Sequence, residues 1–173
     1  RKFNKTAQNN RTENLDILTA NFDFAKKLGH HEIRYGFEGW YNKVNSSAFT
    51  KDILTEEQTA LDTRYASGGS TMYSLAAYIT HTWEITDRVI LNDGIRFSNV
   101  GLNSKFTDTT FFNFPFKEAK QNNNALTGNI GLIYMPSEDC RLTAVFSTGF
   151  RAPNVDDMSK VFETTPGTIT VPN

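Results

Sequence analysis

Few residues of this sequence have the types and the spacing that catalysis or metal binding requires. The histidines are His30, His31 and His81, and the adjacent pair lies in a short turn, where neighbouring side chains rarely share a metal. Cys140 is the single cysteine, which excludes an internal disulfide and a cysteine-based metal cluster. There is no Ser-His-Asp arrangement, no phosphate-binding glycine loop and no pair of carboxylates on rigid elements. We therefore expect neither an enzyme nor a metal site, and no cofactor.

The last regular segment of the chain is followed by a change of chain direction at residues 150–154, which we call the corner. Pro153 prevents further β-ladder pairing, and Asn154 is a preferred N-cap for a short helix predicted to run through Phe162. Asp156 and Asp157 in the first turn of that helix suit its dipole. This explanation is simpler than a cation site at the two aspartates.

Four phenylalanines gather in one long loop, at Phe111, Phe112, Phe114 and Phe116. An exposed apolar cluster usually marks binding or packing onto a neighbour. One interpretation is that the rings fold inward and stabilise the loop. The other is that they offer a hydrophobic contact to a ligand, in which case the candidate ligand contacts are these four rings together with Arg151 and Asn154 of the corner.

The composition bounds the class of protein. The 173 residues carry 18 Lys and Arg against 19 Asp and Glu, so no charge imbalance points to nucleic acid. Mean hydropathy is −0.47, and no stretch approaches the roughly 20 apolar residues of a spanning helix. The sequence starts at Arg1 without a methionine and stops at Asn173 in a loop-like stretch. We therefore expect an internal fragment of an exported protein.

The elements that position these residues alternate apolar and polar side chains with a period of two, which is typical of β-strands. In the clearest segment, Tyr35 and Phe37 fall on one face while Arg34 and Glu38 fall on the other. The first segment slips phase, which a bulge near Ile17 would explain. The pattern predicts about six antiparallel strands, over residues 15–25, 32–42, 72–85, 89–98, 126–134 and 142–150.

The predicted connections alternate in length. Those at 26–31, 86–88 and 136–140 are short, whereas those at 44–69 and 99–124 are several times longer. Outer-membrane barrels have short periplasmic turns and long extracellular loops. The sequence therefore predicts an all-β fold, an antiparallel up-and-down meander that forms part of a transmembrane β-barrel with the short turns in the periplasm.

Charged side chains segregate on one face of the predicted strands, which is then the face toward the lumen. Only His81 and Asp93 intrude on the lipid face. A second bulge or a position near the membrane interface would explain Asp93. We expect the lumenal charges to form ion pairs with one another; the main ones are Arg34, Glu38, Arg96 and Arg141.

The segment Thr148-Gly-Phe-Arg-Ala-Pro-Asn154 resembles the signature in the barrel of TonB-dependent outer-membrane receptors. Ile33-Arg-Tyr-Gly-Phe-Glu38 and Leu91-Asn-Asp-Gly-Ile-Arg96 agree with that family, and the likeness is to the receptors of Bacteroidetes-type bacteria. It covers essentially the whole chain. The resemblance implies that residues 1–173 are part of a large, roughly 22-stranded barrel in the outer membrane of a Gram-negative bacterium, closed by a plug domain outside this sequence.

The resemblance also implies active transport of a scarce ligand such as an iron chelate (a siderophore). The partners would be outer-membrane lipid, the receptor's own plug domain, the TonB complex acting through that plug, and the small extracellular ligand. The lumenal charges named above would then also face the plug. Haem is less favoured, because no histidine lies between Phe150-Arg-Ala-Pro153 and Val171-Pro-Asn173, two motifs that flank a haem-binding histidine in some members.

Two other classes of protein remain as alternatives. A small outer-membrane barrel that acts as an adhesin or structural protein would need at least about eight strands, and the sequence predicts six. A soluble β-barrel that binds a lipophilic ligand would turn its apolar rows inward and its charges outward. Folding in plain buffer without detergent would favour the soluble barrel.

Overall fold

The chain forms an open antiparallel sheet. A computed structural model describes residues 6–111, 114–160, 162–165 and 168–170. Each long strand pairs with the next one along the chain, in the order β1-β2-β4-β5-β6-β7, which confirms the predicted meander. These strands are β1 (Ala7–Leu28), β2 (His31–Asp52), β4 (Ser70–Thr86), β5 (Val89–Lys105), β6 (Glu118–Ser137) and β7 (Cys140–Ser147).

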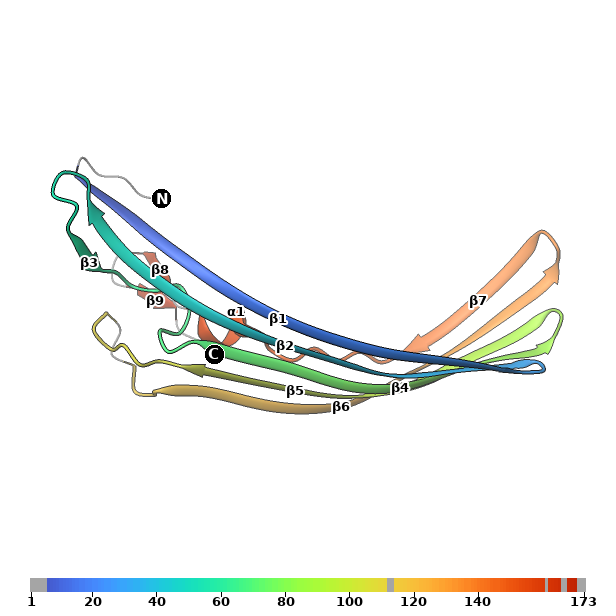
Figure 1. Cartoon of the computed structure of the whole chain (residues 1–173). Coiled ribbons are helices and arrows are strands. Elements are labelled where there is room, and N and C mark those ends of the chain that lie inside the picture. Colours follow the sequence, from blue (N-terminus) through green and yellow to red (C-terminus); the bar gives the residue numbers. More distant parts are fainter. Residues whose placement is uncertain (1–5, 112–113, 161, 166–167, 171–173) are drawn as a thin grey trace.

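Shorter elements gather at one end of the sheet. Figure 1 shows the tight hairpin turns at one end of the long strands and the loops with the small elements toward the other. The first of these, β3 (Gln58–Ala60), pairs with the end of β2. The others are α1 (Val155–Ser159) and the two-stranded sheet of β8 (Phe162–Thr165) and β9 (Thr168–Thr170). No helix in the described part of the chain is long and apolar enough to cross a membrane.

The strands extend further toward the loops than the sequence predicted. β2 continues to Asp52, β5 to Lys105, and β6 already begins at Glu118. The predicted long loops therefore shrink to 53–69, which includes β3, and 106–117. The hydrophobic alternation of the membrane part ends before the strands do, because the face that is apolar there carries polar residues toward the loops, such as Asn99 and Asn103 on β5, while the backbone ladder continues.

Three predicted details are wrong. The β1–β2 register runs without a shift from the Ala7–Asp52 pair to the Leu28–His31 pair, so there is no bulge near Ile17. Because Ile17 is an odd-numbered residue of this regular strand, it lies on the same face as Asp23. The predicted helix ends at Ser159 rather than Phe162, which begins β8. The last strand ends at Ser147, although Thr148 still donates its backbone N–H to Gly128.

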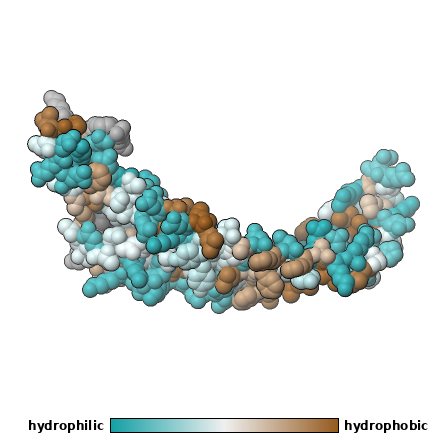
Figure 2. All heavy atoms as spheres, in the orientation of Figure 1, coloured by the Kyte–Doolittle hydropathy of each residue, from teal (hydrophilic) through white to brown (hydrophobic). Residues whose placement is uncertain are grey.

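The sheet has two chemically different faces. We call the apolar face the one that carries the paired large hydrophobic side chains, and the polar face the other. The exposed fractions of Phe22, Phe37 and Phe97 on the apolar face are 60%, 59% and 50%. In Figure 2, brown and tan spheres gather along the middle of the molecule, and teal spheres are frequent toward both ends, although brown spheres also lie at the upper left tip. The apolar face includes Leu18, Phe22, Phe24, Tyr35, Phe37, Tyr41, Leu75, Ile79, Trp83, Leu91, Ile95, Phe97, Leu126, Ile130, Leu132, Tyr134, Leu142 and Phe146.

The buried clusters lie near the loop end, and their strand residues belong to the polar face. In one, Ala66 and Phe106 are buried against three partly buried side chains: Phe114, Phe116 and Ala119. In the other, strand residues Met72, Val100 and Leu102 are buried beneath the corner and α1, with contributions from Trp40, Ala152, Val155 and Met158. The loops therefore fold over the polar face instead of extending away from the sheet.

Candidate functional site

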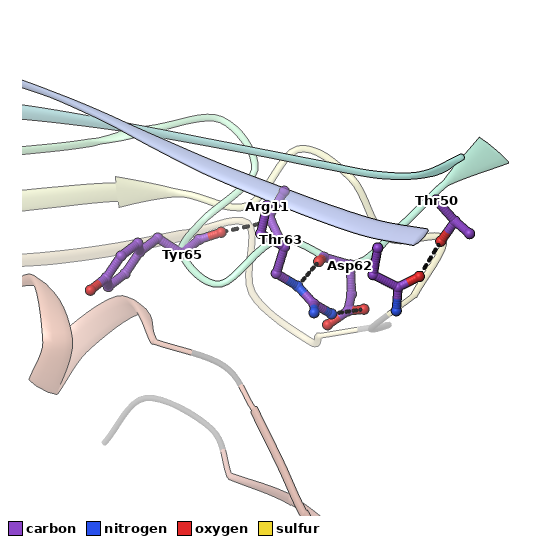
Figure 3. A network of polar contacts seen from close by, with 6 residues as sticks. Arg11, Thr50, Asp62, Thr63 and Tyr65 are labelled. Carbon is purple, nitrogen blue, oxygen red and sulfur yellow. Dashed lines mark hydrogen bonds and ion pairs between the residues drawn. The ribbon is translucent and has the colours of Figure 1, made fainter. Parts of the chain in front are cut away.

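Hydrogen bonds connect the loop after β3 to the first residues of β1. Arg11 Nη2 contacts Asp62 Oδ1 at 2.7 Å, and Arg11 Nε donates to the Asp62 carbonyl oxygen at 3.1 Å. Thr63 Oγ1 donates to the Tyr65 carbonyl oxygen at 2.7 Å. Figure 3 shows the Arg11 side chain reaching from β1 to Asp62, with Thr63 and Tyr65 following in the same loop. Two bonds from one guanidinium fix the position of this loop against the sheet.

Tyr65 connects this loop to the corner. Its hydroxyl donates to Asp156 Oδ1 at 2.9 Å. Burial, followed by the hydrogen bond to Asp156, raises the pKa of the Tyr65 phenol above its usual value. The phenol therefore stays protonated and keeps donating at physiological pH. The contact brings together two segments that are separated by 91 residues in the chain.

The corner is a capped helix start. Asn154 Oδ1 accepts from the backbone N–H of Asp157 at 3.0 Å, and Asp157 Oδ2 accepts from the backbone N–H of Asn154 at 3.0 Å. This is a capping box, which satisfies two backbone donors that a helix start leaves open. Arg151 Nη2 approaches Asp157 Oδ2 at 3.3 Å, with 80% of the Arg151 side chain exposed. Of the two candidate ligand contacts at the corner, Asn154 is thus engaged by the backbone, whereas Arg151 projects outward.

The helix is held on the sheet by a hydrogen-bonded serine group. Ser70 and Ser104 are paired across β4 and β5, with their hydroxyls 2.8 Å apart. Ser159 at the end of α1 reaches Ser70 at 3.4 Å and also donates to the Val155 carbonyl oxygen at 2.8 Å. All three serines are buried. The sequence analysis missed this group, because isolated serines carry no signal until the strand register is known.

The phenylalanine loop is divided between packing and exposure. Phe114 and Phe116 each meet the Phe106 ring edge-on at 5.4 Å and stack on each other at 5.2 Å. Phe111 is 41% exposed. Phe112 lies outside the described residues. Inward packing thus accounts for Phe114 and Phe116, and Phe111 is the described ring that offers apolar surface to the outside.

The charged residues predicted to face the lumen lie on the polar face. Glu38 and Arg96 come together across three strands, with Oε2 and Nη2 2.5 Å apart. Arg34 instead contacts Glu32 of its own strand, with Nε and Oε1 2.5 Å apart. Arg141, on β7, has no ion-pair partner among the described residues. A shallow depression of about 440 Å³ adjoins the Glu38–Arg96 pair; its other lining residues include Tyr78, Gly94, Asn129 and Thr148.

The histidines lie at the short-turn end of the sheet, as predicted. His30 Nδ1 is 3.9 Å from Glu84 Oε2. His31, His81 and Asp93 form a hydrogen-bonded series on the apolar face. The register through Asp93 is unbroken on both sides, so the second bulge suggested for Asp93 is wrong. Among residues 6–111 and 114–160, no group of three or more His, Cys, Asp or Glu side chains could hold a metal ion.

These features define the class of protein. An antiparallel meander with an exposed apolar face, ion pairs on its other face and loops folded over that second face is a piece of the wall of a large outer-membrane β-barrel. The profile of one family, described as TonB dependent receptor-like, beta-barrel, matches residues 2–173. The chain belongs to this family of receptors.

Relatives of known name match part of the chain. The pesticin receptor of Yersinia enterocolitica (serotype O:8 / biotype 1B) is 30% identical over 87 residues, which cover 50% of this chain and 13% of that protein. The pesticin receptor of Yersinia pestis gives the same identity and coverage. The matched segment is thus a small part of either relative.

Solved structures show the same fold. The copper transporter OprC superposes with a TM-score of 0.71 at 13% identity, over 86% of this chain and 23% of OprC. The ferric yersiniabactin uptake receptor FyuA from Yersinia pestis gives a TM-score of 0.56 at 18% identity, over 82% of this chain and 22% of FyuA. The siderophore receptor PiuA from Acinetobacter baumannii gives 0.58 at 14% identity, over 79% of this chain and 24% of PiuA.

The family places the chain in the bacterial outer membrane, as a stretch of barrel wall. The polar face is then the lumenal face, the apolar face contacts lipid, and the loop end is extracellular. The family match disfavours both the small adhesin barrel and the soluble ligand-binding barrel. The number of 22 strands stays a prediction, since the described sheet supplies six long strands of the wall.

Proposed function

We propose that this chain is the part of a TonB-dependent receptor that helps to admit a ferric chelate through the outer membrane. The observation that carries the proposal is the position of the corner segment. It folds over the lumenal face near the extracellular end and leaves the Arg151 side chain 80% exposed. A ligand entering from outside would meet this side chain, and the Phe111 ring of a neighbouring extracellular loop is 41% exposed. Ferric chelates carry acidic oxygens and apolar rings, which suit those two groups.

The other partners follow from the same arrangement. We propose that residues 1–173 belong to the barrel domain and that a plug domain from elsewhere in the full protein fills the lumen. Arg34, Arg141 and the Glu38–Arg96 pair lie on the lumenal face, where they would meet the plug. TonB would act through that plug and not through this segment.

Transport measurements in cells test the function. Deleting the gene should abolish uptake of ⁵⁵Fe supplied as a chelate under iron limitation, and a plasmid copy of the full-length gene should restore it. Removing TonB should abolish it as well. Uptake that continues without TonB, or that requires the receptor for copper but not for any ferric chelate, would contradict the proposal. The copper control matters because both a copper transporter and siderophore receptors share this fold.

A binding measurement tests the site. In the purified full-length receptor, Arg151→Ala should weaken binding of the transported chelate by about tenfold or more, because one charge-assisted hydrogen bond contributes about 1.5–3 kcal/mol. Arg88→Ala is the matched control, since Arg88 is an exposed arginine in a turn at the opposite end of the strands. Equal affinity in the Arg151 and Arg88 variants would remove Arg151 from the site.

A further inference from the structure

A polar series crosses the lipid-facing side of the sheet near its periplasmic end. His31 Nδ1 lies 3.0 Å from His81 Nε2, and His81 Nδ1 lies 3.1 Å from Asp93 Oδ2. The three side chains come from β2, β4 and β5. The His31 ring also stacks on Trp83, with ring centroids 5.3 Å apart. The surrounding rows of this face are apolar, so ionisable groups here need an explanation.

The hydrogen bonds fix the direction of the series. Because the Asp93 carboxylate only accepts, His81 Nδ1 carries the proton between them, and His81 Nε2 is left to accept from His31 Nδ1. His31 Nε2 is therefore left without a partner at one end, as an acceptor in the neutral ring and as a second donor in the imidazolium. At the other end, Asp93 Oδ1 makes no hydrogen bond within the described chain, and 42% of the Asp93 side chain is exposed.

A cation extends the same row. Lys26 pairs in register with Ile33, Ile33 with His81, and His81 with Asp93. Lys26 therefore faces lipid on β1, diagonally across from His31, and forms no ion pair within the described residues. The row thus presents the Lys26 ammonium on β1, the unpartnered His31 Nε2 on β2 and an incompletely bonded carboxylate on β5. If the series served only to connect β2, β4 and β5, its internal hydrogen bonds would be explained. The unbonded groups at its two ends would not be.

The depth of the series matches lipid headgroups rather than acyl chains. Asp93 is the fifth residue of β5, which begins just after the periplasmic turn. Four residues of a strand at about 3.3 Å each, tilted by about 40°, rise about 10 Å. This height corresponds to the boundary between headgroups and hydrocarbon. Trp83 suits the same boundary, where aromatic rings of barrels concentrate.

We propose that this surface binds the headgroup of a periplasmic-leaflet phospholipid that carries both a phosphate and a primary ammonium, the chemistry of phosphatidylethanolamine. Lys26 donates to the phosphate, His31 donates to it from Nε2 as the imidazolium, and the Asp93 carboxylate accepts from the ammonium. His31 and Asp93 lie two strand spacings apart across the sheet and two residues apart along it, or about 12 Å between their backbones. A phosphate-ammonium headgroup with a hydrogen bond at each end fits this span.

The test uses the purified, delipidated full-length receptor and native mass spectrometry. Short-chain phosphatidylethanolamine and phosphatidylglycerol are added separately, because the second lipid has the phosphate but lacks the ammonium. The wild type should retain phosphatidylethanolamine with a preference of about fivefold. Asp93→Asn keeps an acceptor for His81 but removes the charge, and it should reduce the ratio to about one. His31→Phe should weaken the binding of both lipids.

His30→Phe is the matched control, since His30 is the adjacent histidine but stands outside the series. It should bind like the wild type. Heat-dependent gel mobility of the barrel checks that each variant is folded. If Asp93→Asn does not fold, the comparison of His31→Phe with His30→Phe remains as the test. Equal binding of the two lipids by the wild type would overturn the proposal. So would an unchanged preference in folded Asp93→Asn, because the series would then only connect strands.

Discussion

A single glycine allows a contact across three strands. Tyr78 on β4 donates its hydroxyl to Asp23 on β1, although β2 lies between them. Gly36 on β2 lies beneath this contact, and a Cβ there would come within 2.8 Å of the Tyr78 hydroxyl oxygen and 2.5 Å of the Phe22 carbonyl oxygen. The missing side chain lets the tyrosine ring lie over the neighbouring strand, as when aromatic rings cover glycines in other sheets.

Gly36→Ala should therefore destabilise the full-length receptor. Neither the Phe22 carbonyl nor the strand can shift without disturbing the ladder, so we expect a loss of about 1–3 kcal/mol in the free energy of unfolding. The urea dependence of unfolding in detergent measures it. Gly149→Ala is the control, because nothing lies within 4 Å of a Cβ at Gly149. Equal unfolding midpoints for the two variants would contradict this account of Gly36.

Asn154 can be tested for its role as a helix cap. If it positions Arg151 and Asp157 through the capping box, Asn154→Ala should weaken chelate binding about fivefold, since a cap contributes about 1 kcal/mol. Asn154→Ser should bind almost like the wild type, because serine is also a good cap. The dissociation constant of the chelate in the full-length receptor is the measurement. A serine variant as weak as the alanine variant would indicate direct ligand contact instead.

At the scale of elements, the corner acts as an insert on the lumenal wall. Although α1 has only five residues, it buries Val155 and Met158 against strand residues of β4 and β5 and hydrogen-bonds to them through Ser159. Short helices are not stable alone, so this packing and the capping box hold it. The corner and α1 therefore narrow the lumen near the extracellular end. Local helix propensity alone would not order so short a segment.

A designed disulfide tests that docking in the full-length receptor. Ser70 Oγ and Ser159 Oγ are 3.4 Å apart, so Ser70→Cys with Ser159→Cys should oxidise spontaneously once Cys140 is replaced by serine. Mass spectrometry of the non-reduced protein detects the bond. Ser47→Cys with Ser159→Cys is the control, since Ser47 lies on the other face of the sheet. Reduced thiols in the first pair would show that α1 is not docked as described.

The sequence predicted the strands better than their ends. Alternation located all six strands, because lipid and lumen impose opposite polarities on successive side chains. It failed above the membrane, at 43–52 and 99–105, where the face that is apolar within the membrane carries mostly polar side chains. The alternation pattern also led to a wrong bulge at Ile17, because an apolar side chain on the lumenal face looks in the sequence like a shift of the alternation by one residue.

The candidate site was less predictable than the sheet. The capping role of Asn154 follows from residues adjacent to it, and the sequence predicted it. The contacts of Tyr65 with Asp156 and of Ser70 with Ser159 join segments 91 and 89 residues apart. Such contacts depend on the register of intervening strands, so no local pattern indicates them.

At the scale of the whole molecule, the described sheet has two open edges, on β1 and β7. Unpaired strand edges promote aggregation, and the apolar face adds a wide hydrophobic surface whose natural solvent is lipid. The buried clusters are small and lie toward one end. The stability of this segment thus depends on the neighbouring strands of the barrel and on the membrane.

Residues 1–173 produced alone should therefore fail to form a monodisperse folded species in plain buffer. We expect aggregates in size-exclusion chromatography, whereas the full-length receptor in detergent should elute as one species. Circular dichroism of both samples provides the comparison. A monomeric, folded fragment in detergent-free buffer would contradict the assignment of the apolar face to lipid.

The nearly unbroken register also determines the slope of the strands. His31, at the first hairpin, is level with Trp83, Leu91 and Leu132 across the sheet, yet β6 continues about five residues past Leu132 to reach its own hairpin at Ser137. From the first hairpin to the third, the short turns are therefore displaced along the strand direction by about 17 Å, over four strand spacings of about 4.8 Å each. This stagger corresponds to a tilt of about 41°, inside the 35–45° of closed barrels. The positions of the short turns in the sequence thus indicate how far neighbouring strands are offset from one another, and this offset is the quantity that sets the tilt of the strands in the barrel.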